Sequence, residues 1–181
     1  MSLVNLVQKK ESFEFVHHCH ATAAIKLSLK FKTPVIVLIR HPRDAVASNY
    51  LKHFALRNTS QPDEIDTALL LHEILSYMDF YGYVDDKKDA MNIVEFNWLV
   101  KNPLEFVNLA IELAGISGID FCDDEILIFE REFRKKESAK NPLGSSLPQA
   151  SRERMSEQVK LIMDKLPEMT RCERLYHQII G

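Results

Sequence analysis

The stretch VIVLIRHPRDAVASNYLKHF, from Val35 to Phe54, predicts the fold of this chain. Its first five residues are aliphatic and rich in β-branching, as expected of a strand that is buried on both faces of a parallel sheet. Pro42 suits the first turn of a helix, where its missing N–H would have no partner, and Asp44 places negative charge near the positive end of the helix dipole. We therefore expect a buried strand ending at Arg40 and a helix from about Pro42 to Ala55.

The segments on both sides of this stretch alternate between strand-like and helix-like patterns. Short runs of aromatic and β-branched residues predict further strands at residues 12–18 and 91–96. Helix-forming composition and apolar periodicity predict helices at residues 21–31, 63–83, 123–140, 151–166 and 171–179, with Ser151 as a cap and with loops at 58–62 and 141–149. Such alternation is typical of an α/β protein with a parallel sheet flanked by helices.

One further helix, expected to begin at Asn102 and Pro103, has a definite apolar face. Asn102 suits the N-cap, Pro103 suits the first turn, and Gly115 supplies the stop. Apolar residues recur at i, i+3, i+4, i+7 and i+8, which predicts a core face made of Phe106, Leu109, Ala110, Leu113 and Ala114.

The composition fits a single globular domain spanning residues 1–181 and excludes several partners. The chain has a formal charge of −3, so no global positive field favours nucleic acid, and any phosphate site must be local. The apolar runs fall short of the ~18 residues that would cross a bilayer, so we expect no membrane partner. Cys19, Cys122 and Cys172 show no paired spacing, which favours reduced thiols in a cytoplasmic protein.

Arg40 and Ser48 are the candidate ligands of a phosphate group. In open parallel sheets, ligands bind just beyond the carboxyl ends of the strands, where Arg40 would present a planar guanidinium group. Ser48 lies two turns along the expected helix, on the same face as Asp44, and can donate its hydroxyl proton. The alternative is that Arg40 pairs with Asp44 and only holds the junction between strand and helix.

The run RHPRDAVAS, from Arg40 to Ser48, resembles the 3′-phosphate-binding motif of the PAPS-dependent sulfotransferases. That motif reads Arg, any residue, Pro, Arg or Lys, Asp, three mostly small or aliphatic residues, then Ser. The resemblance implies a P-loop-like parallel sheet, with Arg40 and Ser48 contacting the 3′-phosphate of PAPS or of its product PAP. Residues 93–116 also resemble a later family segment, although Phe96, Asn97 and Trp98 replace its usual Tyr-Glu-Asp.

Two histidines are candidates for the catalytic base. The run FVHHCHA, at residues 15–21, resembles a family strand that ends in Lys-Thr-His, whose histidine acts as the base. By this resemblance His20, or alternatively His18, would take the proton of the acceptor as it attacks sulfur. His18 and His20 also allow a metal site on one strand face or a structural role, but no carboxylate or cysteine pattern accompanies them, so we expect no metal.

Part of the family pattern is not found in this sequence. Nothing in residues 1–14 resembles the Pro-Lys-Ser-Gly-Thr-like loop that holds the 5′-phosphosulfate, and the late Arg-Lys-Gly run is not recognisable. The cations Arg134, Lys135, Lys136 and Lys140 are interpreted as a solvated helix face. We therefore expect an N-terminally truncated domain, with residues 1–3 as a leader, that is inactive alone and forms homo-oligomers through an exposed sheet edge.

The sequence thus predicts a domain that transfers a sulfuryl group from PAPS to a hydroxyl or amine of a small-molecule or glycan acceptor. A catalytically inactive nucleotide-binding or interaction module of the same fold is the alternative. A phosphotransferase is disfavoured because the sequence has no Walker-type glycine-rich loop. The aromatic residues Tyr77, Phe80, Tyr81 and Tyr83 are interpreted as core rather than as an acceptor pocket.

Overall fold

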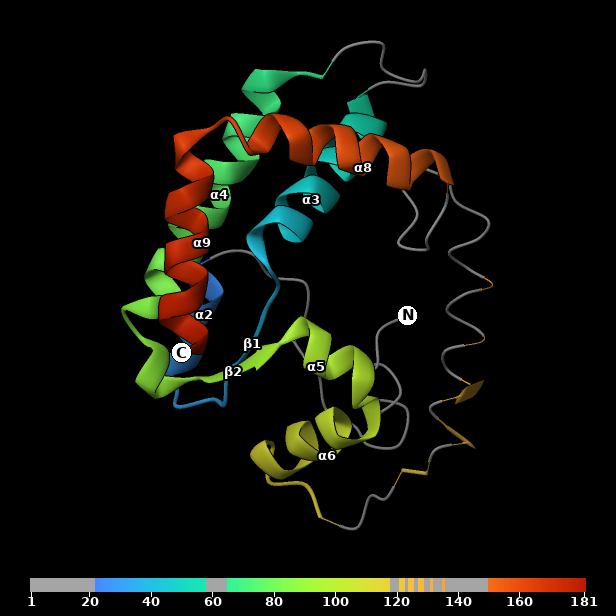
Figure 1. Ribbon diagram of the computed structural model, residues 1–181. Helices are drawn as coiled ribbons and strands as arrows, with labels where there is room; N and C mark the ends of the chain where they lie inside the picture. Colours follow the sequence, from blue (N-terminus) through green and yellow to red (C-terminus); the bar gives the residue numbers. More distant parts are fainter. Residues whose placement is uncertain are drawn as a thin grey trace. The chain divides into compact units, whose positions relative to one another are not determined.

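The computed structural model describes residues 22–57, 65–117, 121–122, 124–125, 127–128, 131, 135 and 150–181. These residues are mostly helical and contain a small parallel sheet, so the chain is a mixed α/β protein (Figure 1). They belong to two compact units, one within residues 1–39 and 87–135 and the other within residues 40–86 and 136–181. No helix in the described part is both long and apolar enough to cross a membrane.

Within the described part of the first unit, the sheet consists of two strands, and their parallel pairing is as predicted. β1 (Ile36–Ile39) pairs with β2 (Asn92–Glu95) in a register that places Ile36 opposite Asn92 and Ile39 opposite Glu95. The backbone N–H of Asn92 also donates to the carbonyl oxygen of Val35 at 2.9 Å, which extends the pairing by one bond. The predicted strand at residues 12–18 and the loops at 58–62 and 141–149 lie outside the described residues, as does most of the predicted helix at 123–140.

The prediction that β1 is buried on both faces is wrong. Val37 and Ile39 lie on one face and are 5% and 0% exposed, whereas Leu38 points to the other face and is 38% exposed. Successive side chains of a strand point to opposite faces, so each face is buried only as far as other elements cover it. The described residues cover one face of β1 better than the other.

The first unit also contains α2 (Thr22–Lys30), a short 3₁₀ helix (Lys88–Ala90), α5 (Phe96–Lys101) and α6 (Pro103–Leu113). The predicted helix at residues 21–31 is confirmed by α2. The short helix α5 was not predicted; it follows β2 directly and packs against both β2 and α6.

The expected start of α6 at Asn102 and Pro103 and the expected stop at Gly115 are both confirmed, although the Asn102 side chain makes no capping hydrogen bond. Asn102 precedes α6, but its side-chain amide donates to the carbonyl oxygen of Trp98 at 2.8 Å and caps no N–H of α6. Gly115 has a φ of +67°, and the N–H groups of Gly115 and Ile116 donate to the carbonyl oxygens of Glu112 and Ile111. This pair of bonds is a Schellman motif, which ends a helix by satisfying its last carbonyl groups.

The core face of α6 is rotated from the predicted one. Its buried residues are Phe106, Val107, Ala110 and Ile111. The periodicity identified Phe106 and Ala110 correctly, but Ala114 is exposed. Apolar residues surround most of this helix, so the sequence period alone did not fix which of them face the core.

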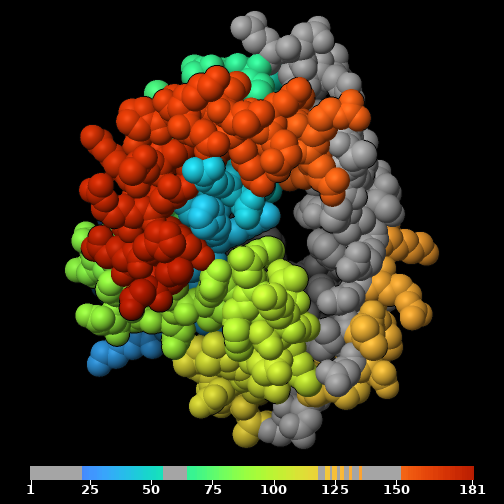
Figure 2. Space-filling model, in the orientation of Figure 1, coloured from blue at the N-terminus to red at the C-terminus, as the bar shows by residue number. Residues whose placement is uncertain are grey.

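The second unit is a group of helices around α3 (Pro42–Arg57). α3 contacts α4 (Thr67–Asp85), α8 (Ala150–Met163) and α9 (Pro167–Ile180), and α4 packs along α9. Figure 2 shows the C-terminal helices, in orange to red, lying directly against α3, in cyan. The most buried side chains of the unit come from all four helices and include Val46, Tyr50, Leu70, Ile74, Val159, Met163 and Cys172.

The starts of α4, α8 and α9 differ from the predicted ones. α4 begins at Thr67 rather than at residue 63, because the side chain of Asp66 accepts a hydrogen bond of 2.9 Å from the N–H of Leu69 and caps the helix there. α8 begins at Ala150, so Ser151 lies inside the helix and is not its cap. α9 begins at Pro167, which takes the first helical position that suits proline.

Candidate functional site

A pocket of the second unit contains both predicted phosphate ligands. Arg40 is the residue that follows β1, and α3 begins two positions later at Pro42. Arg40, Ser48 and seven further residues line a cavity of about 210 Å³. The lining comes from the start of α3 and from α8, and the further residues are Asp44, Leu51, Arg152, Glu153, Ser156, Glu157 and Lys160.

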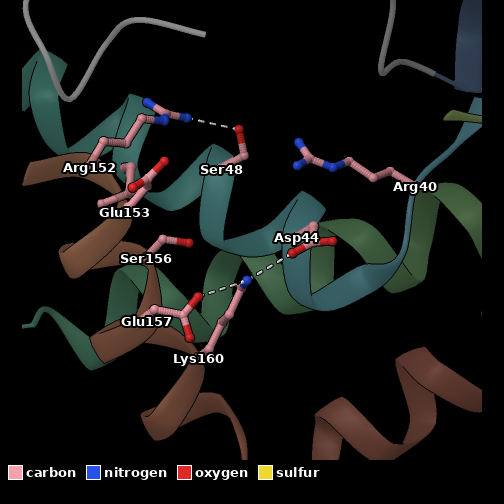
Figure 3. A pocket seen from close by; sticks show the side chains of 9 residues that line it. Arg40, Asp44, Ser48, Arg152, Glu153, Ser156, Glu157 and Lys160 are labelled. Carbon is pink, nitrogen blue, oxygen red and sulfur yellow. Dashed lines mark hydrogen bonds and ion pairs between the residues drawn. The ribbon is translucent and has the colours of Figure 1, made fainter. Parts of the chain in front are cut away.

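Two arginines converge on Ser48. The Nη2 atom of Arg152, on α8, donates a hydrogen bond of 3.0 Å to the Oγ atom of Ser48, on α3. Figure 3 shows the guanidinium groups of Arg40 and Arg152 pointing toward Ser48 from opposite sides. We call the part of the pocket around Ser48, Arg40 and Arg152 the Ser48 end.

The other end of the pocket has its positive charge neutralised. The Nζ atom of Lys160 lies 3.0 Å from a carboxylate oxygen of Asp44 and 3.2 Å from one of Glu157 (Figure 3). Burial lowers the pKa of Lys160, but its hydrogen bonds to Asp44 and Glu157 and the negative charges of these two groups together raise it by more, so the net shift is upward from 10.5. Lys160 is therefore a charged bridge between α3 and α8.

The backbone of Arg40 is held by a buried tyrosine. The hydroxyl of Tyr77, on α4, donates a hydrogen bond of 3.0 Å to the carbonyl oxygen of Arg40, and Tyr77 is only 6% exposed. Burial raises the pKa of Tyr77 far above its usual value, so the hydroxyl stays a donor at all physiological pH values. The ring of Tyr81 packs 4.4 Å from that of Tyr77, between centroids. Tyr77 and Tyr81 are buried core residues, as predicted.

Arg43, next to the pocket, ties α3 to the C-terminal helices. Its guanidinium group pairs with Asp164, just beyond the end of α8, and its Nε atom donates to Glu173 of α9 at 2.6 Å. The hydrogen bond to Glu173 is the main cause of the raised pKa of Arg43. Arg43, Asp44 and Ser48 thus form one polar strip of α3 that faces α8 and α9.

The structure brings together some of the predicted site residues. Arg40 and Ser48 line one pocket, and the ion pair made by Asp44 is with Lys160 rather than with Arg40. His18 and His20 lie outside the described residues, as do Arg134, Lys136 and Lys140. No group of three or more metal-ligating side chains lies together in the described ranges of the chain.

No motif or spacing in the sequence identified Arg152 or Lys160 as pocket residues. Both lie in the charged helix α8, and Arg152 is separated from its partner Ser48 by 104 positions. A charged helix usually presents such residues to solvent, and no local pattern distinguishes the ones that turn inward.

The described pocket can bind a small anion at its Ser48 end, through charge-assisted and hydroxyl hydrogen bonds. A comparison of the chain with protein-family models, with curated proteins and with solved structures finds no match.

Proposed function

We propose that the Ser48 end of the pocket binds the 3′-phosphate of PAPS or PAP and that the chain is a sulfotransferase-like domain. In the proposed reaction a sulfuryl group passes from PAPS to a hydroxyl or amine of a small-molecule or glycan acceptor. The observation that carries the proposal is that Arg40 and Ser48, the two ligands named by the RHPRDAVAS motif, line one pocket.

The chemistry of the Ser48 end suits a phosphate group. Arginine presents a planar fork that can bind two phosphate oxygens at once, and a serine hydroxyl can donate to a third. The chain carries a formal charge of −3, so a phosphate ligand requires a local concentration of positive charge such as the one around Ser48. At the other end of the pocket, Asp44 and Glu157 face Lys160 and disfavour an anion.

The size of the cavity favours one phosphate group over an entire nucleotide. Pockets that enclose a drug-sized ligand usually measure ~300 Å³ or more, and this cavity measures about 210 Å³. We propose that the 3′-phosphate enters the Ser48 end and that the adenosine and the 5′-phosphosulfate extend beyond the lining residues.

The junction between β1 and α3 supports a P-loop-like fold within the same proposal. A parallel strand that delivers a ligand residue directly into the start of a helix is the arrangement by which open α/β sheets bind phosphate. In this proposal His20, or alternatively His18, remains the candidate base.

The second candidate function is a nucleotide-binding or interaction module without catalysis. It is favoured by the Ser48 end of the described pocket, where Arg40, Ser48 and Arg152 supply groups that can bind an anion without any chemical step. The two candidates make the same prediction for PAP binding and differ in turnover. Transfer of labelled sulfate from PAPS to a panel of hydroxyl and amine acceptors would support the transferase.

The first experiment is a calorimetric titration of the chain with PAP, with ATP and AMP as controls, at low salt. We expect selective binding of PAP, because only PAP carries a phosphate on the 3′ position. Arg40→Ala should weaken PAP binding by ~2 kcal/mol, which is about 30-fold, since it removes a charge-assisted contact.

Arg174→Ala is the matched control, because Arg174 is an exposed arginine of α9 outside the pocket. It removes the same charge from the same unit and should leave PAP affinity unchanged. Equal affinities of the unmodified chain and Arg40→Ala for PAP would reject the proposed site.

A further inference from the structure

We propose that Arg152 of α8 is a third, specificity-determining ligand of the bound phosphate and that phosphate binding ties α8 to α3. This inference rests on the proposed function, because it names a further ligand at the same site. Its starting point is the hydrogen bond of 3.0 Å from the Nη2 atom of Arg152 to the hydroxyl oxygen of Ser48.

This hydrogen bond leaves Ser48 prepared to donate. A serine hydroxyl has one proton to donate and two lone pairs that can accept. Arg152 donates to one lone pair, so the proton of Ser48 is left for another acceptor. The positive charge of Arg152 also polarises the hydroxyl and makes its proton a better donor to an anion. Arg152 therefore orients Ser48 before any ligand arrives.

Arg152 also supplies a second positive charge at this end, beside that of Arg40. A phosphate monoester carries close to two negative charges near neutral pH. Arg40 supplies one positive charge, and Lys160, the remaining cation of the lining, is bridged between Asp44 and Glu157. The guanidinium group of Arg152 points toward Ser48 opposite Arg40, so a phosphate beside Ser48 would lie between two arginines (Figure 3).

A phosphate held in this way would join the two helices. Arg40 stands at the start of α3, whereas Arg152 lies in the first turn of α8. The other end of α8 is already held to α3, through Lys160 with Asp44 and through Asp164 with Arg43. Binding at the Ser48 end would therefore stabilise the first turns of α8 against α3, since a ligand stabilises the arrangement that binds it.

The test uses adenosine 3′-phosphate, adenosine 5′-phosphate and PAP as probes of the full chain in calorimetric titrations. Arg152→Ala should weaken the binding of adenosine 3′-phosphate and PAP by at least about tenfold, as expected for the loss of one charge-assisted contact. Arg152→Lys should give an intermediate loss, because lysine keeps the charge without the planar fork.

Arg154→Ala is the matched control for the inference. Arg154 is an exposed arginine of the same helix that does not line the pocket, so its loss should leave binding unchanged. Thermal unfolding of all variants identifies any that fail to fold, and Arg152→Lys, which conserves charge and length, then serves as the test variant.

Hydrogen exchange provides a second readout that a merely structural role of Arg152 would not produce. PAP should slow the exchange of amides in the first turns of α8 in the unmodified chain, and this protection should be lost in Arg152→Ala at saturating PAP. If Arg152→Ala binds PAP like the unmodified chain while Arg40→Ala does not, the role of Arg152 is overturned and the proposed function stands. If the unmodified chain shows no preference for 3′-phosphorylated nucleotides, both are overturned.

Discussion

The hydroxyl of Tyr77 donates a hydrogen bond of 3.0 Å to the backbone carbonyl oxygen of Arg40, and so a core residue of α4 fixes the residue that begins the pocket. Tyr77→Phe should remove this bond without changing the packing of the ring. We expect a loss of ~1 kcal/mol in the free energy of unfolding and a few-fold loss of PAP affinity, because the carbonyl of Arg40 loses a buried donor.

Tyr50→Phe is the matched control for this variant. The hydroxyl of Tyr50 accepts a hydrogen bond of 2.9 Å from the backbone N–H of Asp66, so its removal costs a comparable bond away from Arg40. It should lower stability by a similar amount and leave PAP affinity unchanged. Urea unfolding and calorimetry on both variants separate the two effects, and an unchanged PAP affinity in Tyr77→Phe would exclude a positioning role for Tyr77.

Lys160→Met should lower stability slightly and weaken phosphate binding much less than the loss of Arg40 does. The ion pairs of Lys160 with Asp44 and Glu157 are partly exposed, so their loss should cost less than ~1 kcal/mol and less still at high salt. PAP affinity should fall much less than in Arg40→Ala, because the carboxylates left unpaired lie at the end of the pocket away from Ser48. A large loss of PAP affinity would instead make Lys160 a phosphate ligand.

The stability difference between the unmodified chain and Lys160→Met should also depend on pH in a defined window. The folded pKa of Lys160 is raised above 10.5, so the protonated amine contributes its full stability below pH 10.5. That contribution should be lost as the pH rises through the folded pKa. Urea unfolding of both proteins from pH 7 to pH 11 measures the difference, and a difference that grows above pH 10.5 would have the wrong sign.

The pair of His53 and Glu73 should be important for the packing of α3 on α4. Glu73 is 3% exposed, and its carboxylate lies 2.5 Å from Nδ1 of His53. His53→Ala should destabilise the chain by ~1–3 kcal/mol, because it leaves a buried carboxylate without this partner. The double variant His53→Leu with Glu73→Leu should be more stable than His53→Ala, since no buried charge remains. Urea unfolding ranks the variants, and a neutral His53→Ala would contradict the account.

The two described cysteines should differ sharply in reactivity. Cys172 is buried, and burial raises the pKa of its thiol to about 11, whereas Cys122 is exposed. Iodoacetamide at pH 8 should therefore label Cys122 and spare Cys172, as read by mass spectrometry of peptides. Denaturant should make both react, and fast native labelling of Cys172 would show that the packing around it opens readily.

Local signals allowed much of this fold to be predicted from the sequence. Each of these signals determines the structure of only the few residues around it. They are the aliphatic run before Arg40, the proline at position 42 and the glycine at position 115, and the elements that they predict are present. Asn102 and Pro103 mark the start of α6 as predicted, but the Asn102 amide donates to the carbonyl oxygen of Trp98 and the side chain makes no capping hydrogen bond, which the spacing did not indicate. The exposure of Leu38 depends on which elements cover the sheet, which no local pattern encodes.

The candidate site was predictable only where it is local in sequence. Arg40 and Ser48 belong to one motif at one junction of strand and helix, and they line one pocket. Arg152 reaches Ser48 through the packing of α8 on α3, which also brings Asp164 to Arg43 and Lys160 to Asp44. Such contacts follow from tertiary packing, so a reading of composition and spacing along the chain missed them.

Ser48 and Arg152 are separated by 104 positions, so Ser48 is synthesised well before its hydrogen-bond partner. A growing chain has finished α3 long before α8 has been translated, so the pocket is incomplete until Arg152 has left the ribosome. A ligand that needs the complete pocket therefore cannot guide the early stages of folding, when only the first half of the chain is available. A premature stop before Ala150 would abolish the pocket while leaving β1 and α3 encoded.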